Sequence, residues 1–249
     1  MTDPRDSRKA QLARIYQNAG QQDLDDLAAS LFEAMDQFGI VDPLEQAHFL
    51  AQVGHETGEL RWREELASGD AYDTRTDLGN TPARDGDGRK FKGRGGMMLT
   101  GRANYEDYDE SVAAHGYILR HPEKLAEPPH FAISAAWFWA SRGLGKLARQ
   151  DNLKAVTRRI NGGYNGLSDR QRLLYLAKQV LLGSAKSNST RELQLALNQL
   201  IKAGLVVDGS DGPRTRKAVR DFQKSQGMVV DGVAGQKTWE RILSLLKKS

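Results

Sequence analysis

The chain has 249 residues, of which 39% are hydrophobic and 27% are charged, a composition typical of a folded protein with one or two domains. No apolar run reaches the roughly 18 residues that span a bilayer, and the charged N-terminus lacks the apolar core of a secretory signal. The absence of cysteine excludes disulfides, thiolate metal sites and a cysteine nucleophile.

Two amphipathic helices are predicted within the first 60 residues. The first has apolar residues at spacings of three and four, and Gly39 can end it: Leu24, Leu27, Leu31, Met35 and Phe38. The second has Asp42 at the N-cap, Pro43 at N1 and Glu45 at N3, an arrangement that predicts a capping box. Gly58 is expected to end this helix in a left-handed conformation.

A long loop region rich in Gly, Asp, Arg and Thr is expected from residue 68 to residue 96, and long ordered loops are often functional. Helical patterns return at residues 131–143 and 152–160. The glycine-rich turn NGGYNGLSDRQ then leads into a helix that we expect Ser168 to cap and that ends near Gly183.

The C-terminal quarter contains an internal repeat after a small, polar linker at residues 184–190. DGSDGPRT (208–215) and DGVAGQKT (231–238) share the pattern D-G-x-x-G-x-x-T, and their aspartates are expected to form turns that cap the following helices. A third helix precedes both repeats. Residues 191–249 contain 11 Lys/Arg and 6 Asp/Glu, a net charge of +5 that favours an anionic partner.

The stretch GHETGELRWREE (54–65) is the strongest candidate for chemistry. HETGE has Glu59 where a zinc-binding H-E-x-x-H motif needs a second histidine, so no metal site is expected. On an unbroken helix, Glu56 and Glu65 would lie on opposite faces, but a chain break at Gly58 would let Glu65 return across a cleft. Two carboxylates across a cleft are typical of glycoside hydrolysis, and the alternative is a solvated acidic face.

Four blocks occur in the order and spacing of family 19 glycoside hydrolases: GHETGEL, WREE, KFKGRGGMMLTGRANY and RRINGGYNGLSDRQRLL. Over residues 10–183 the chain resembles the endolysin branch of this chitinase-like family. The repeats and the string TRKAVRDFQ resemble a type 1 peptidoglycan-binding domain. The resemblance implies a mainly α fold, with a lysozyme-like helical catalytic domain at residues 1–183 and a small three-helix wall-binding domain at residues 191–249.

The resemblance also implies roles for the residues that match the motifs. Glu56 corresponds to the general acid of the family, and Glu65, rather than Glu64, corresponds to the base that acts on water. Thr100 corresponds to the hydroxyl residue that helps to hold this water. Glu59 and Glu64 are expected to be solvated surface charges.

Five further residues are expected to bind substrate. Asn104 and Asn161 correspond to asparagines that contact sugar in the family. Trp62 and Tyr72 flank the expected cleft and are candidates for sugar contacts. Arg159 precedes the NGG turn and could orient this turn or pair with one of the two catalytic carboxylates.

The predicted function is that of a phage-type endolysin, which hydrolyses β-1,4 bonds of peptidoglycan with inversion and lyses the cell. Met98 stands where the family usually has glutamine, so a chitinase and a non-catalytic wall-binding protein remain alternatives, and a lytic transglycosylase is a further one. We expect a monomer without cofactor, nucleic-acid partner or membrane insertion. It would be made in the host cytoplasm and would reach the wall after holin-type release.

Overall fold

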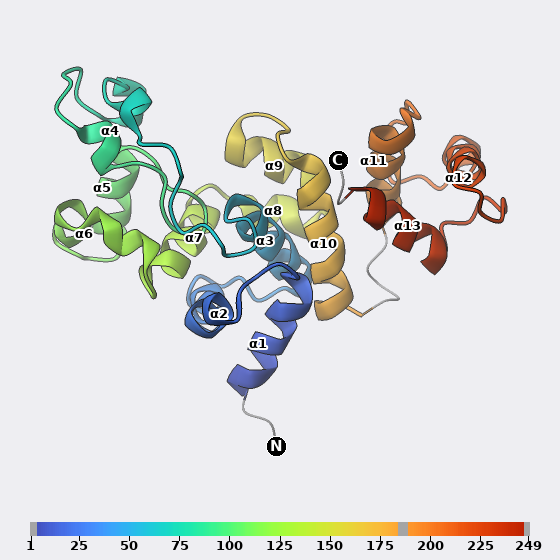
Figure 1. The fold of residues 1–249 in the computed structure, drawn as a ribbon, viewed down its shortest axis with the longest axis horizontal. Helices are drawn as coiled ribbons and strands as arrows, with labels where there is room; N and C mark the ends of the chain where they lie inside the picture. The colour runs from blue at the N-terminus through green and yellow to red at the C-terminus, as the bar shows by residue number, and fades with distance from the viewer. Residues whose placement is uncertain (1–3, 184–188, 247–249) are drawn as a thin grey trace.

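The computed structural model describes residues 4–183 and 189–246, and over these residues the fold is mainly helical (Figure 1). This confirms the predicted mainly α class. Two isolated β-bridges, Glu64–Arg94 and Arg94–Leu99, are the only β pairing in the described segments. No helix in this part of the chain combines the length and apolar character needed to cross a membrane.

The N-terminal part, up to residue 183, is built from helices that are joined by short turns and, between α3 and α4, by a long loop region. Its helices are α1 (Pro4–Ile15), α2 (Gln21–Gln37), α3 (Pro43–Glu56), α4 (Asp87–Lys90), α5 (Arg102–Ser111), α6 (Tyr117–Arg120), α7 (His130–Ser141), α8 (Leu144–Arg149), α9 (Leu153–Asn161) and α10 (Leu167–Leu181). Short 3₁₀ turns lie at Asp70–Tyr72, Thr76–Leu78 and Pro122–Ala126. The loop region expected between residues 68 and 96 thus contains α4 and two of these turns.

Helix α3 lies at the centre of the N-terminal core. It begins as predicted, because the Asp42 carboxylate accepts hydrogen bonds from the backbone N–H groups of Leu44 (2.9 Å) and Glu45 (3.0 Å). The reciprocal half of the capping box is absent from the described contacts. The Glu45 carboxylate instead accepts from Trp139 Nε1 at 3.0 Å and from Arg149. Its side chain is therefore used to join α3 to α7 and α8.

Helix α10 packs against α3, and its start differs from the prediction. The N-cap is Gly166, with φ +69°, and Ser168 lies inside the first turn. A Cβ at Gly166 would lie 2.0 Å from the ring of His55, so only glycine allows α10 to approach α3 this closely. This close approach, rather than a side-chain cap, determines where α10 begins.

The C-terminal part contains α11 (Thr190–Ile201), α12 (Pro213–Ser225) and α13 (Gln236–Leu246), at the right of Figure 1. These helices enclose their own apolar cluster, which includes Phe222, Trp239 and Ile242. Ser189 caps α11 in a complete capping box with Glu192. Most of the expected linker, residues 184–188, lies outside the described residues.

The C-terminal helices dock on α10. The rings of Tyr175 and Trp239 stack with centroids 5.4 Å apart, and Gln171 donates a hydrogen bond to the Glu192 carbonyl oxygen. Lys178 Nζ lies 2.9 Å from Glu192 Oε1 and 2.6 Å from Asp151 Oδ1, all within a buried contact. The helix that packs on α3 therefore also carries the C-terminal part.

This buried contact should make stability depend on pH. Burial raises the pKa of Glu192 to about 7, although Lys178 acts in the opposite direction. Because this pKa exceeds that of an unfolded glutamate, the folded state holds an extra proton between about pH 4.5 and pH 7. The stability contributed by Glu192 is therefore complete below this range and is lost as the pH rises through it.

We expect Glu192→Gln to remove this loss. The Tm of the variant minus the Tm of the wild type should increase between pH 5 and pH 8 by on the order of 5 °C. Burial lowers the pKa of His48, which faces Asp151, and this makes stability rise with pH in both proteins. The difference between the two plots of Tm against pH removes this shared contribution and is therefore the quantity to measure. A difference that stays constant with pH would contradict the prediction.

Candidate active site

Glu56 is the last residue of α3, and its carboxylate is held by α10. Its Oε1 accepts a hydrogen bond from Arg170 Nη2 at 2.6 Å, and its side chain is 19% exposed. Arg170 is buried, and its other guanidinium nitrogen donates to the Gln52 side chain one turn earlier on α3. The packing of two helices thus orients one carboxyl group that remains accessible to solvent.

The chain turns sharply after Glu56. Gly58 has φ +56°, as predicted, and Glu59 and Leu60 also have positive φ values. A Cβ at Gly58 would lie 2.8 Å from Trp62 Cδ1, so a side chain there would meet the indole ring. This turn ends α3 and directs the following residues toward a different part of the molecule. Trp62 is 44% exposed beside it.

Glu65 is held by a neighbouring loop segment and not by a helix. Its backbone N–H donates to the Gly93 carbonyl oxygen at 2.9 Å, and its Oε1 accepts from the Gly93 N–H at 3.0 Å. Its Oε2 accepts from the Tyr72 hydroxyl at 3.1 Å. Burial and the charge of Glu65 raise the pKa of Tyr72, which keeps that hydroxyl protonated as a donor.

Thr100 lies on the same side of Gly93 as Glu65. A Cβ at Gly93 would lie 3.2 Å from Thr100 Oγ1 and 3.5 Å from Glu65 Oε2. The Thr100 hydroxyl donates to the carbonyl oxygen of Met98 at 2.8 Å, and Met98 has φ +49° in a tight turn. The structure therefore brings the carboxylate and the hydroxyl together over a glycine that leaves the space between them open.

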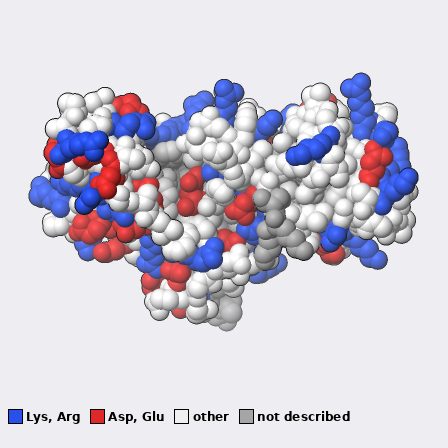
Figure 2. Space-filling model, turned by 45° about the horizontal axis from the view of Figure 1, so that its top comes forward, with Lys and Arg blue, Asp and Glu red and all other residues white. Residues whose placement is uncertain are grey.

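The molecule is visibly hollowed on the face drawn in Figure 2. The hollow separates the lobe that contains α4, α5 and α6 from the part that contains α9 and α10, and acidic side chains are visible within it. An open hollow with acidic walls is suited to an extended substrate more than to a small enclosed ligand.

A glycosyl hydrolase family 19 domain-containing protein of Haemophilus influenzae is 30% identical over 165 residues, which cover 54% of this chain and 79% of that protein. The chain belongs to glycosyl hydrolase family 19. Residues 186–242 match the family described as "Putative peptidoglycan binding domain". The predicted combination of a family 19 glycosidase with a C-terminal peptidoglycan-binding domain is confirmed.

Two further similarities extend this comparison. The fold resembles that of chitinase C from Streptomyces griseus HUT6037, with a TM-score of 0.57, 20% identity and coverage of 72% of this chain and 94% of that chain. An autolytic lysozyme of Clostridium acetobutylicum is 35% identical over 86 residues, which cover 31% of this chain and 26% of that protein. The matched region therefore covers about a quarter of the length of that lysozyme.

The two asparagines expected to bind substrate make hydrogen bonds within the glycosidase itself. Asn104 Nδ2 donates to the Thr100 carbonyl oxygen at 2.7 Å, and its Oδ1 accepts from Arg142 at 2.8 Å. Asn161 is exposed, and its Oδ1 accepts from the Gly163 N–H at 2.9 Å. Asn104 thus supports the segment of Thr100, and Asn161 shapes the NGG turn.

Of the two roles considered for Arg159, the pairing with Glu56 or Glu65 is not found. Arg159 lies exposed on α9, and within residues 4–183 and 189–246 it makes no ion pair with either carboxylate. The partner of Glu56 is Arg170, from the first turn of α10. Sequence reasoning missed this residue, although the block RRINGGYNGLSDRQRLL contains it. Arg170 lies three residues after the start of a helix rich in apolar residues, and a charged residue at that position was the available signal of a buried ion pair.

The expectation that Glu59 is a solvated charge is also wrong. Glu59 is buried, accepts from Arg172 Nη2 at 2.6 Å, and binds Asn18 through two further hydrogen bonds. The left-handed conformation at Gly58 and Glu59 places this side chain against α10 and against the turn that follows α1. Glu64 is half exposed, as expected, but it pairs with Arg94 at 3.1 Å.

Proposed function

We propose that this family 19 glycosidase hydrolyses β-1,4 glycosidic bonds of bacterial peptidoglycan, with Glu56 as the general acid and Glu65 as the general base. The observation that carries the proposal is the pair of partly exposed carboxyls held in different ways. Glu56, at the end of α3, is bound by the buried Arg170. Glu65 is bound by Gly93 and Tyr72, and its carboxylate lies near the Thr100 hydroxyl.

The proposed reaction is an inverting hydrolysis. Glu56 donates its proton to the glycosidic oxygen, and the Arg170 guanidinium stabilises the carboxylate that remains. Glu65 removes a proton from a water molecule that Thr100 helps to hold, and this water attacks the anomeric carbon from the opposite face. Inversion requires about 6.5–9.5 Å between the two carboxyl groups, which leaves room for the water.

Peptidoglycan is favoured as the substrate because of the C-terminal domain and the similarity to an autolytic lysozyme. The test is to digest purified peptidoglycan and chitin oligomers side by side and to analyse the released fragments by mass spectrometry. We expect peptidoglycan fragments with ordinary reducing ends. Anhydro-sugar ends would instead indicate a lytic transglycosylase, and digestion of chitin alone would indicate a chitinase.

The space above Gly93 gives a prediction about this reaction. Gly93→Ala should lower kcat by about 10- to 100-fold, because a displacement of reacting groups by about 1 Å can cost about 100-fold. The new methyl group would lie between the Thr100 hydroxyl and the Glu65 carboxylate. Kinetics on soluble wall fragments, together with Tm, measure the effect.

The matched control for Gly93→Ala is Gly20→Ala, whose methyl group meets only the end of the Asp23 side chain. The control should retain wild-type kcat. If Gly93→Ala also retains wild-type kcat while its fold is intact, the space between Glu65 and Thr100 is not used by the reacting water.

We further propose that the glycosidase acts as a monomeric endolysin that lyses bacteria, with residues 1–183 as the catalytic domain and residues 191–249 as the wall-binding domain. It would be made in the host cytoplasm and would reach the wall after holin-type release. Expression in a bacterium with and without a pore-forming membrane protein tests this. We expect the turbidity to fall only when both proteins are present.

A further inference from the structure

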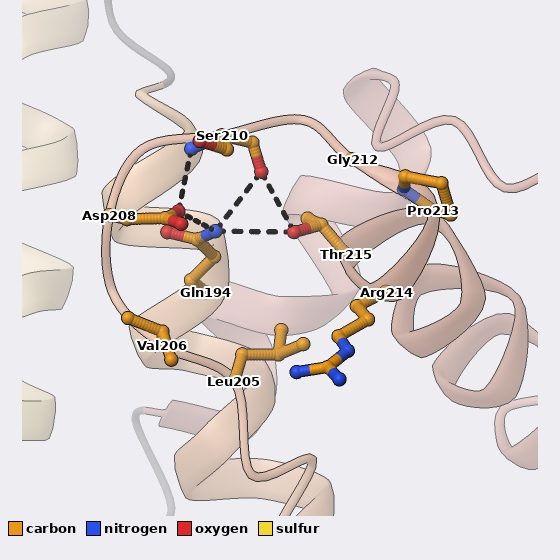
Figure 3. Close-up of a pocket in the computed structure, with 9 residues that line it drawn as sticks. All are labelled: Gln194, Leu205, Val206, Asp208, Ser210, Gly212, Pro213, Arg214 and Thr215. Carbon is orange, nitrogen blue, oxygen red and sulfur yellow. Dashed lines mark hydrogen bonds between the residues drawn. The ribbon is translucent and has the colours of Figure 1, made fainter.

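The C-terminal domain contains two grooves at equivalent positions in its two sequence repeats. The first groove, of about 410 Å³, is lined by residues that include Leu205, Val206 and Arg214 (Figure 3). The second groove, of about 470 Å³, is lined by residues that include Met228, Val229 and Lys237. Each pair of equivalent residues is 23 positions apart, which is the offset of the repeat.

The same hydrogen-bond network closes both repeats. In the first, Gln194 Nε2 donates to Asp208 at 2.9 Å and to Thr215 at 3.2 Å, and its Oε1 accepts from the Gly209 N–H at 2.9 Å. Figure 3 shows the hydrogen bonds of Gln194 with Asp208 and Thr215 beside the groove. The repeat motif therefore builds the wall of the groove, and its polar atoms are engaged within the protein.

In the second repeat, Gln223 takes the place of Gln194. Its Nε2 donates to Asp231 at 2.7 Å and to Thr238 at 3.3 Å, and its Oε1 accepts from the Gly232 N–H at 2.9 Å. The two grooves are thus copies of one construction and not unrelated hollows of the surface.

These contacts confirm that the two aspartates form turns, but they correct the expectation that the aspartates cap the following helices. Asp208 accepts from the backbone N–H of Ser210 at 2.8 Å, and Asp231 accepts from that of Val233 at 2.8 Å. Each aspartate closes a turn two residues long, as Asx turns do, and does not cap a helix. The N-cap of α12 is Gly212, which has no side-chain cap.

Apolar surface and an unpaired cation remain available to a ligand in each groove. Val206 is 71% exposed and Val229 is 82% exposed, so each groove has an apolar side chain that a ligand could cover. Arg214 and Lys237 occupy equivalent rim positions, and neither forms an ion pair with any other described residue. In Figure 3 the Arg214 side chain extends from α12 toward Leu205.

The chemistry of this lining favours a peptide over a sugar. Sugar-binding sites commonly use aromatic rings, but neither groove has an aromatic residue in its lining. A valine or leucine floor suits small alkyl groups, and a free cation at the rim suits a carboxylate. The short stem peptides of peptidoglycan present alanine methyl groups and free carboxylates, whereas its glycan strands present mainly hydroxyl and acetamido groups.

We propose that the two grooves bind two stem peptides of peptidoglycan, so that the C-terminal domain attaches to the wall bivalently. This inference rests on the proposed function, since it takes the bacterial wall as the partner. Two weak sites on one domain raise the overall affinity for a repeating polymer, because the second contact forms within the same complex. The net charge of +5 over residues 191–249 acts in the same direction toward an anionic wall.

The test uses full-length chains that also carry Glu56→Gln, so that the wall is not digested during binding. Arg214→Glu, Lys237→Glu and the double variant are compared by co-sedimentation with intact sacculi. Lys224→Glu, an exposed α12 residue outside both grooves, is the charge-matched control for the single variants. Lys224→Glu with Arg241→Glu is the control for the double variant.

Each single groove variant should bind sacculi about tenfold more weakly than its control, because loss of either groove removes the bivalent attachment. The double variant should lose saturable binding. An amidase can remove the stem peptides from sacculi. The protein with unmodified grooves should bind these peptide-free sacculi no better than the double variant binds intact sacculi. Unchanged affinity of the groove variants, or equal binding to peptide-free glycan, overturns the proposal.

The outcome is separable from that of the proposed function. Hydrolysis of small, soluble wall fragments does not require attachment to sacculi, so chains with an intact Glu56 and altered grooves should retain it. If those chains hydrolyse fragments but groove variants bind sacculi as well as their controls do, the stem-peptide inference fails and the glycosidase function stands. If the unaltered chain hydrolyses no wall fragment, the proposed function itself fails.

Discussion

Replacing Glu56 with glutamine is expected to lower kcat on peptidoglycan by about 100- to 10,000-fold, because an amide cannot deliver the proton that the leaving oxygen needs. The substitution is nearly isosteric, and the amide oxygen can still accept the hydrogen bond that Arg170 Nη2 donates at 2.6 Å. Folding should therefore be retained. The release of reducing ends from purified wall, measured together with Tm, gives the result.

The matched control is Glu64→Gln, a change of the same chemistry eight residues away. Glu64 is half exposed and pairs with Lys92 and Arg94, and such surface ion pairs contribute about 1 kcal/mol or less. We expect its activity to stay within about twofold of the wild type. A Glu56→Gln variant that is folded and hydrolyses wall as fast as this control would exclude Glu56 as the general acid.

The local geometry around Glu56 could be predicted from the sequence because short-range signals determine it. Asp42 and Pro43 mark the start of α3, and Gly58 marks its end, and all three behave as expected. The partner of the carboxylate could not be predicted in this way. Arg170 is 114 residues away in the chain and reaches Glu56 only because α10 packs along α3, a contact that depends on Gly166 beside His55.

The C-terminal helices also could be predicted from short-range signals, whereas their contact with the rest of the chain could not. The repeats predicted three C-terminal helices, and these are present at the expected places. Their attachment to α10 was not predicted, because a polar linker suggests parts that move independently. Tyr175 and Lys178 have ordinary positions on an amphipathic helix, and nothing in their spacing shows that Trp239 and Glu192 will cover them.

The second large effect is expected for Glu65→Gln, which should lower kcat by about 100- to 10,000-fold and leave KM nearly unchanged. The base acts on the attacking water, so its contribution is made in the transition state and not in binding of the sugar chain. The amide oxygen can still accept from the Gly93 N–H, and the amide NH2 can donate to the Tyr72 hydroxyl oxygen, so the loop segment should keep its position. Initial rates over a range of soluble fragment concentrations separate kcat from KM.

Tyr72→Phe is the control that separates positioning from chemistry. It removes only the hydroxyl that donates to Glu65 Oε2 at 3.1 Å, a hydrogen bond of about 1 kcal/mol, so the rate should fall less than about tenfold.

Truncation to Glu65→Ala leaves space next to Thr100 for a small anion such as azide to attack in place of activated water. Added azide should restore turnover to this variant and give a glycosyl azide of inverted configuration, whereas a residue with a purely structural role would show no such rescue.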